Sequence, residues 1–470
     1  MKALSKTLWC LFLGLWLMAW SADYLCAQEE ITGDWNGLLK VQGMQLRLVF
    51  HVEQSGVGYT ATMDSPDQGA EGIPVTSISF QDSQLELEVS PLGINYQGIM
   101  DTNNFIKGTF KQAGQSFPLD LSKEFLEKEV LQRPQEPTEP FPYDSDEVSI
   151  NSVDGVTLAG TLTQPKSGAS SVVVLISGSG PQDRDETFMS HKPFLVLADH
   201  LTRQGIAVLR YDDRGTAEST GNFNSATSED FANDVKYVIN YLINEHKFSN
   251  IGLIGHSEGG LIAPMVASES TEVKFIVLLA GPGMAGDQIL IKQNELMSRD
   301  MGQNSDETAY GLEVAKTAFE IIKGSTDPEK LSNELESYLI EAYKSPLAVV
   351  PEGMKSEDLI KLQVNRLASP WMRYFLTYDP KPTLSKVECA VLAINGEKDV
   401  QVTVDNLAHI EQALVAGGNQ STTIKSYPGM NHLFQPCETG SINEYAQIEQ
   451  TISPLVLEDI SDWIRRQVKQ

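Results

Sequence analysis

The sequence predicts an α/β fold with a helical insertion, preceded by a small all-β domain. In the C-terminal part of the chain, continuous runs of Val, Ile and Leu alternate with stretches of helical periodicity, as in a parallel sheet covered by helices. In the N-terminal part, short runs alternate apolar and polar residues, which is typical of strands with one buried face. A proline-rich segment lies between the two patterns and indicates a domain boundary.

Composition and charge narrow the class of protein. The chain has 470 residues, 41% hydrophobic and 21% charged, which is ordinary for a globular protein with about two or three domains. Its formal net charge of -28 makes the surface strongly acidic, and such a surface repels nucleic-acid phosphates and anionic membranes. We therefore expect no nucleic-acid partner, while the oligomeric state stays open.

Residues 1–27 have the pattern of a secretory signal peptide. Two lysines precede an apolar run at residues 8–20, which is too short to span a bilayer, since spanning takes about 20 residues. Cleavage is expected after Ala27, with Ser21 as an alternative. We expect an exported protein, periplasmic or extracellular, with no stable membrane anchor after processing. Removal of the segment leaves Cys389 and Cys437, which excludes a disulfide framework and leaves open whether the two pair.

Residues 28–132 are expected to form the β-rich domain. Leu46, Leu48 and Phe50 are one example of the period-2 pattern, and turn-forming residues separate such runs. About 90 residues of this kind predict a small antiparallel sandwich or barrel. Aromatic residues open an alternative role as a carbohydrate-binding module; the candidates for a stacking surface are Trp35, Tyr59 and Tyr96. Residues 133–145 contain four prolines and are expected to be the linker.

Residues 146–470 are expected to form the α/β domain. Asp154-Gly155 separates two strand-like runs and predicts a hairpin at its start. Helical periodicity from about Thr227 predicts an amphipathic helix between the second and third buried strands. Amphipathic stretches at about 284–384 interrupt the alternation, so we expect a helical cap there. The predicted buried strands are 172–176, 207–211, 251–254, 275–279 and 391–394.

The pentad Gly255-His256-Ser257-Glu258-Gly259 makes Ser257 a candidate nucleophile. It follows the run at 251–254 and opens a stretch of helix-forming residues. A strand, a sharp turn and a helix hold a serine at a strained corner, where flanking glycines avoid clashes. By chance the pattern occurs in roughly one chain in five of this length, so it needs partners elsewhere.

A serine hydroxyl needs a base that removes its proton and an acid that orients the base. Of the seven histidines, only His409 and His432 follow the nucleophile. His409 lies in a helical stretch, whereas His432 lies in a turn-rich loop after a short strand, where active sites of α/β sheets collect. Asp399 follows the strand at 391–394 and is the candidate acid, with Asp405 in reserve.

Acyl transfer also needs donors for the negative oxygen of its intermediate. The backbone N–H of Glu258, next to the nucleophile at the helix start, is one candidate. The other is expected from the glycine-rich loop after the strand at 172–176. In that loop Ser179 is the preferred donor and Gly180 the alternative.

Five motifs in this order resemble bacterial α/β-hydrolase carboxylesterases of the EstD type. They are SGSGPQDRD (177–185), YDDRG (211–215), GHSEGG (255–260), NGEKD (395–399) and NH (431–432), with SPWMRYF (369–375) in the insertion. The resemblance implies an α/β-hydrolase fold and a serine carboxylesterase that cleaves short-chain acyl esters of small molecules. It also implies an acyl-enzyme intermediate and no metal or organic cofactor.

Two further expectations accompany this resemblance. Five charged residues of the first two motifs are expected to form ion pairs that hold the loops around the pocket: Asp183, Arg184, Asp185, Asp213 and Arg214. The nearest alternative activity is a serine peptidase of the prolyl-oligopeptidase type on the same fold. The N-terminal domain argues against it, because about 90 residues are too few for a propeller of four or more blades.

Overall fold

The computed structural model describes residues 31–41, 44–56, 58–103, 105–112, 115–127, 132–350 and 354–468. They divide into two compact units, with the boundary at residues 128–129. The predicted signal peptide, residues 1–27, lies outside the described residues. Within the described ranges, no helix is both long enough and apolar enough to cross a membrane.

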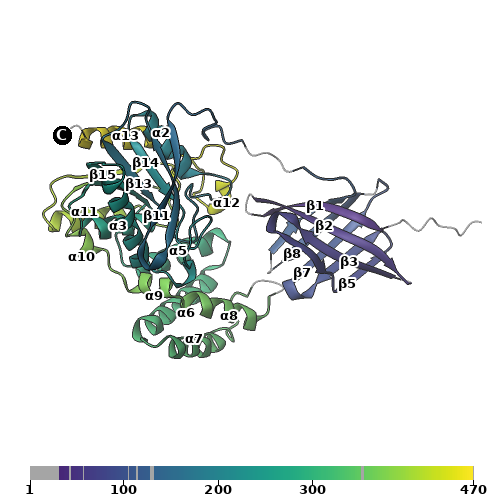
Figure 1. Cartoon of the computed structure of the whole chain (residues 1–470). Helices are drawn as coiled ribbons and strands as arrows, with labels where there is room; N and C mark the ends of the chain where they lie inside the picture. The colour runs from purple at the N-terminus through teal and green to yellow at the C-terminus, as the bar shows by residue number, and fades with distance from the viewer. Residues whose placement is uncertain are drawn as a thin grey trace, which may run out of the picture. The chain divides into compact units, whose positions relative to one another are not determined.

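The N-terminal unit is an antiparallel sheet that curves around its own core (Figure 1). Its strand order is β4-β3-β2-β1-β10-β8-β7-β6-β5, with β9 paired to β8. The period-2 prediction is confirmed: in β6, Leu85, Leu87 and Val89 are buried and the residues between them are exposed. The strands are β1 (Gly33–Val41), β2 (Met44–Ser55), β3 (Gly58–Ser65), β4 (Ala70–Pro74), β5 (Ser77–Gln81), β6 (Gln84–Val89), β7 (Ile94–Met100), β8 (Phe105–Gln112), β9 (Gln115–Pro118) and β10 (Leu121–Ser122).

Two of the three aromatic residues considered for carbohydrate stacking belong to the core of this unit. Trp35 and Tyr96 are both fully buried, and Trp35 donates its indole N–H to the carbonyl of Ile31 at 2.7 Å. Tyr96 lies over two glycines, since a Cβ on Gly98 or Gly108 would approach its hydroxyl to 2.6 or 2.2 Å. The interpretation of Trp35 and Tyr96 as a stacking surface was therefore wrong: they fill the space inside the curved sheet.

The second unit is built on an eight-stranded sheet of order β11-β12-β14-β13-β15-β16-β17-β18. The first two strands form the predicted hairpin and pair antiparallel, with the short 3-10 helix η3 (Val153–Gly155) between them. From β14 onward the strands are parallel, which confirms the predicted buried strands. The strands are β11 (Asp144–Asn151), β12 (Thr157–Gln164), β13 (Ser171–Ile176), β14 (Ala207–Tyr211), β15 (Asn250–His256), β16 (Val273–Leu279), β17 (Ala390–Gly396) and β18 (Thr422–Tyr427).

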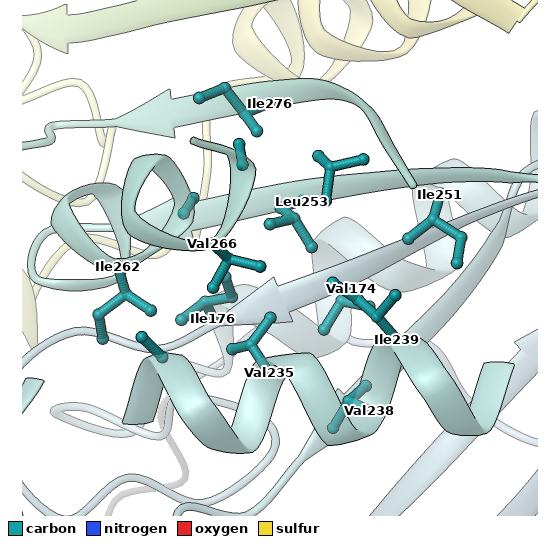
Figure 2. Close-up of a cluster of buried hydrophobic side chains, with 14 of the residues drawn as sticks. Val174, Ile176, Val235, Val238, Ile239, Ile251, Leu253, Ile262, Val266 and Ile276 are labelled. Carbon is teal, nitrogen blue, oxygen red and sulfur yellow. The ribbon is translucent and has the colours of Figure 1, made fainter. Parts of the chain in front are cut away.

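Helices cover both faces of this sheet. In β13, Val172 and Val174 pack with α3 (Ser228–Asn244), α4 (Gly259–Ala267) and α11 (Asn406–Ala416). Val173 and Leu175, which alternate with them, pack with α2 (Pro193–Arg203) and α13 (Pro454–Val468). Figure 2 shows the first of these cores, where side chains of α3 and α4 meet those of the central strands. Another, shorter helix is α12 (Ile442–Tyr445).

The start of α3 follows the predicted helix signal. Thr227 is the N-cap residue and forms a capping box with Asp230, in which each side chain binds the other's backbone N–H. Phe231, Val235 and Val238 lie on the buried face, as their helical spacing predicts.

The stretch between β16 and β17 is helical, as expected for the insertion. Its helices are α5 (Gly286–Asp300), α6 (Ser305–Gly324), α7 (Pro328–Ala342), α8 (Ser356–Leu367), α9 (Pro370–Thr377) and α10 (Lys381–Leu384). Residues of α6, α7, α8 and α9, for example Phe319, Leu335, Ile360 and Leu376, share a separate core. This arrangement confirms the predicted fold class, an α/β unit with a helical insertion and an all-β N-terminal unit.

Candidate active site

Ser257 lies at the turn between β15 and α4. Its φ is +51°, in the left-handed region that non-glycine residues rarely adopt. The flanking glycines permit this close turn, because a Cβ on Gly255 would lie 1.9 Å from the Gly259 oxygen, and one on Gly259 would lie 2.0 Å from the Ile176 oxygen. The Ser257 N–H donates to the carbonyl of Leu279 at 2.8 Å. The local geometry is that of a nucleophile elbow.

The candidate acid and base form a buried pair. His432 Nδ1 lies 2.6 Å from Asp399 Oδ2, and the two side chains are 5% and 0% exposed. The other carboxylate oxygen accepts the backbone N–H groups of Gln401 and Val402 at 2.8 and 2.9 Å. With Nδ1 engaged by the carboxylate, Nε2 is left as the nitrogen that could serve as a base. The reserve candidates do not reach this pair, since Asp405 and His409 are exposed on α11.

The candidate base and the candidate nucleophile lie at the same edge of the sheet. Ser257 follows β15, Asp399 follows β17 and His432 follows β18, and these strands run parallel. His256, the residue before the serine, lies against His432, with ring centroids 4.7 Å apart. In the described part of the chain, Ser257 Oγ has no hydrogen bond, so the structure joins acid to base but records no direct bond from base to nucleophile.

Of the two candidate oxyanion donors, one directly follows Ser257 and the other lies in the loop after β13. Glu258 is the N-cap residue of α4. The loop that carries Ser179 passes beside Ser257, because a Cβ on Gly178 would lie 3.3 Å from the serine Cβ. The Gly178 N–H is already used in a 2.7 Å bond to Glu186. Among the residues the structure describes, the N–H groups of Ser179 and Glu258 have no recorded partner, which leaves them as the donors to test.

A small cavity with two buried carboxyl groups adjoins the elbow. Its volume is about 10 Å³, which is room for about one water molecule. Its lining residues are Ile176, Ser177, Gly178, Tyr211, Asp213, Phe231, Glu258 and Ile262. Burial raises the pKa of Glu258 and raises that of Asp213 well above its usual range.

Glu258 also links the elbow to the insertion. Its Oε1 accepts the Ser228 hydroxyl at 2.6 Å and the indole N–H of Trp371 at 2.7 Å. Trp371 belongs to α9, within the motif at 369–375 that the sequence comparison singled out. The helical insertion therefore contacts the residue directly after the nucleophile.

The ion pairs predicted for the first two motifs form at Arg184, Asp185 and Arg214, whereas among the described residues Asp183 and Asp213 form none, so the prediction was wrong for these two. Arg184 pairs with Asp212, at 2.8 Å, and Arg214 with Asp234, at 2.6 Å. Arg210 forms an ion pair with Asp185. Two other acidic residues of these motifs act without a cation: Asp183 accepts backbone N–H groups, and Asp213 accepts the Ser177 hydroxyl and the Gln182 N–H.

Sequence reasoning missed two residues that the structure brings to this site, Glu186 and His256. His256 Nδ1 lies 2.8 Å from Glu186 Oε1, and His256 Nε2 lies 3.1 Å from the carbonyl oxygen of His432. Their positions in the sequence could have drawn attention to them: His256 directly precedes Ser257 in the pentad, and Glu186 directly follows the first motif. Among the described residues, no cluster of three or more His, Cys, Asp and Glu could hold a metal ion.

The fold and the elbow define the class of protein as an α/β-hydrolase. The model of one protein family, described as "Serine aminopeptidase, S33", matches residues 190–436, a span that includes Ser257, Asp399 and His432. The chain belongs to this family.

One curated relative and two solved structures are similar to this chain. Esterase EstD of Thermotoga maritima is 26% identical over 294 residues, which cover 61% of this chain and 64% of the relative's own length. The Pyrococcus furiosus esterase Pf2001 is 16% identical, with a TM-score of 0.41 over 69% of this chain and 93% of its own. Est1E of Butyrivibrio proteoclasticus, solved with ferulic acid, is 17% identical, with a TM-score of 0.40 over 69% of this chain and 100% of its own.

Proposed function

We propose that this protein is a serine carboxylesterase that hydrolyses short-chain acyl esters of small molecules. One observation carries the proposal: a buried Asp399–His432 pair lies at the same sheet edge as a serine held in a left-handed elbow. A buried carboxylate that fixes an imidazole has a clear use when the other ring nitrogen must remove a proton. The similarity to EstD supports an ester as the substrate.

The proposed mechanism assigns one role to each side chain. Ser257 Oγ attacks the ester carbonyl carbon while His432 Nε2 takes its proton, and Asp399 stabilises the imidazolium. The backbone N–H groups of Ser179 and Glu258 hold the oxyanion of the tetrahedral intermediate. His432 then protonates the departing alkoxide, which leaves an acyl group on Ser257. A water molecule, deprotonated by the same base, attacks that acyl group and releases the acid.

The insertion has a proposed role as a cap over the acyl pocket. Its contact with the elbow through Trp371 and Glu258 supports this role. Apolar residues of the insertion also pack beside the elbow, since Ile289 and Phe375 share a cluster with Leu261 and Val402. A cap in this position would set the length of the acyl chain that is accepted.

Ser257→Ala tests the central assignment. Turnover of an aryl acetate should fall to the background of the assay, because no other group in the mechanism can form the acyl-enzyme. Ser268→Ala, at the far end of the same helix α4, is the matched control and should keep full activity. Full activity in Ser257→Ala would sink the proposal.

Aminopeptidase activity is the second candidate, because the family description names it. Aminoacyl anilides and short-chain aryl esters can both be chosen to release a coloured leaving group. One purified sample can therefore be assayed on both kinds of substrate. We expect the higher kcat/KM on the esters. A higher kcat/KM on aminoacyl anilides, abolished by Ser257→Ala, would assign the same machinery to peptides instead.

We also propose that the protein acts after export. The lysines and the apolar run within residues 1–27 support this location. Fractionation of cells that express the full-length chain should find a shortened protein outside the cytoplasm. An unprocessed chain in the cytoplasmic fraction would contradict export.

A further inference from the structure

Glu186 contacts two parts of the active site through one oxygen atom. This side chain is only 3% exposed and lies in the loop between β13 and α2, where its backbone adopts a left-handed φ of +52°. Glu186 Oε1 accepts the N–H of Gly178 at 2.7 Å. Gly178 lies in the oxyanion loop, residues 177–181, which also carries Ser179. The same oxygen lies 2.8 Å from His256 Nδ1, on the nucleophile strand.

His256 extends this contact to the loop that carries the base. Its Nε2 lies 3.1 Å from the backbone oxygen of His432, which can only accept a hydrogen bond. Since Glu186 Oε1 already accepts the Gly178 N–H, it acts as an acceptor toward His256 as well. Both ring nitrogens of His256 therefore donate, and the ring that fits this geometry carries two protons.

The electrostatics agree with that assignment. Burial by itself lowers the pKa of His256, but the charge and hydrogen bond of Glu186, with the His432 carbonyl, outweigh it and raise the pKa. A buried imidazolium is stable only beside a counter-charge, and Glu186 supplies one. No other part of the proposed mechanism uses either side chain.

We propose that Glu186 and His256 form a positioning pair for the reaction, which sets the oxyanion loop and the His432 loop against the nucleophile strand. This inference rests on the proposed esterase function. Neither residue touches the substrate in the mechanism, so each acts through the groups it holds. One carboxylate thus couples the loop of Ser179 to the loop of His432 across β15, the strand that directly precedes Ser257.

Two substitutions test the pair. Glu186→Gln removes the negative charge but keeps the size of the side chain and an oxygen that can accept the Gly178 N–H. His256→Asn keeps a donor near the position of Nδ1 but is too short to reach the His432 carbonyl. For each we expect kcat on an aryl acetate to fall by about 10- to 100-fold, since misplacement of about 1 Å costs about 100-fold. KM should change by less than about threefold, because substrate contacts remain.

The matched control is Asp67→Asn, which removes a largely buried carboxylate with a cationic partner, Arg47, in the N-terminal unit, none of whose residues has a role in the proposed mechanism. It should lower the unfolding midpoint and leave kcat per folded molecule unchanged. The double variant Glu186→Gln/His256→Asn should be no slower than the slower single variant, because both act through one path. Labelling with a serine-reactive phosphonate counts the folded sites in each sample.

The outcomes separate this inference from the proposed function. If Ser257→Ala is inactive while Glu186→Gln and His256→Asn keep kcat within about threefold of the wild type, the positioning role is wrong and the esterase assignment stands. Multiplicative losses in the double variant would also overturn it, since they would mean two unconnected structural effects. An active Ser257→Ala would overturn both.

Discussion

Gly259→Ala perturbs the elbow by a displacement that can be calculated from the structure. The added Cβ would lie 2.0 Å from the carbonyl oxygen of Ile176 and 2.8 Å from that of Ser177, both backbone atoms of the neighbouring strand end. Real Cβ atoms essentially never approach another heavy atom closer than 3.0 Å, so the start of α4 and the end of β13 must separate by about 1 Å. Since α4 begins directly after Ser257 and Glu258, the move displaces the nucleophile and one oxyanion donor.

A shift of this size should be costly for catalysis. We expect kcat on an aryl acetate to fall by about 100-fold, the usual consequence of misplacing reacting groups by about 1 Å. The crowding should also cost about 1–3 kcal/mol of unfolding free energy. Stopped-flow kinetics gives kcat, and urea denaturation gives the stability.

Gly311→Ala is the matched control. Gly311 is exposed in the middle of α6, and a Cβ there would meet nothing within 4 Å. We expect unchanged kcat and a gain of up to about 1 kcal/mol from the better helix propensity of Ala. If Gly259→Ala kept kcat within about threefold of the wild type, the close approach of α4 to β13 would not govern the chemistry, and the reasoning would fail.

Three further predictions follow from single contacts. Asp399→Asn should lower kcat by about 10,000-fold without unfolding the protein, because the neutral amide no longer selects the His432 tautomer with a proton on Nδ1; a loss of less than tenfold would refute this. Thr227→Ala should lower the unfolding free energy by about 1 kcal/mol through loss of the α3 cap, with kcat unchanged in the same samples. The hydrogen bond to Asp34, aided by a second carboxylate, raises the pKa of His51. The contribution of His51 to the unfolding free energy should thus be full below pH 6.5 and should fade as the pH rises through the raised pKa. The unfolding free energies of the wild type and of His51→Gln are compared between pH 5 and 9, and a constant difference would contradict the prediction.

Much of the fold was predictable because its signals are local. Continuous apolar runs identified the buried strands, and helical periodicity from about Thr227 placed the start of α3 within one residue. The elbow was predictable for the same reason, since a strand, a glycine-flanked serine and a helix are adjacent in sequence. His432 and Asp399 could be singled out because each follows a strand at the same sheet edge.

The rest depends on contacts that no local pattern encodes. Glu186 and His256 are 70 residues apart, and only the folded sheet brings their side chains within hydrogen-bond distance. Trp35 and Tyr96 have polar neighbours in sequence, as surface residues of a strand also can. The curvature of the sheet determines which of its two faces is inside, and no local pattern encodes that curvature. Asp213 resembled its charged neighbours in sequence, yet its hydrogen-bond partners in the structure are a hydroxyl and a backbone N–H.

The helical insertion separates Ser257 from Asp399 and His432 along the chain. β16 and β17 are direct neighbours in the sheet, yet residues 280–389 lie between them in the chain. Ser257 therefore precedes this detour, while Asp399 and His432 follow it. If the chain were cut between α6 and α7, neither fragment would have a full set of reacting groups. Activity recovered on mixing the two fragments would show that β16 and β17 pair across the cut.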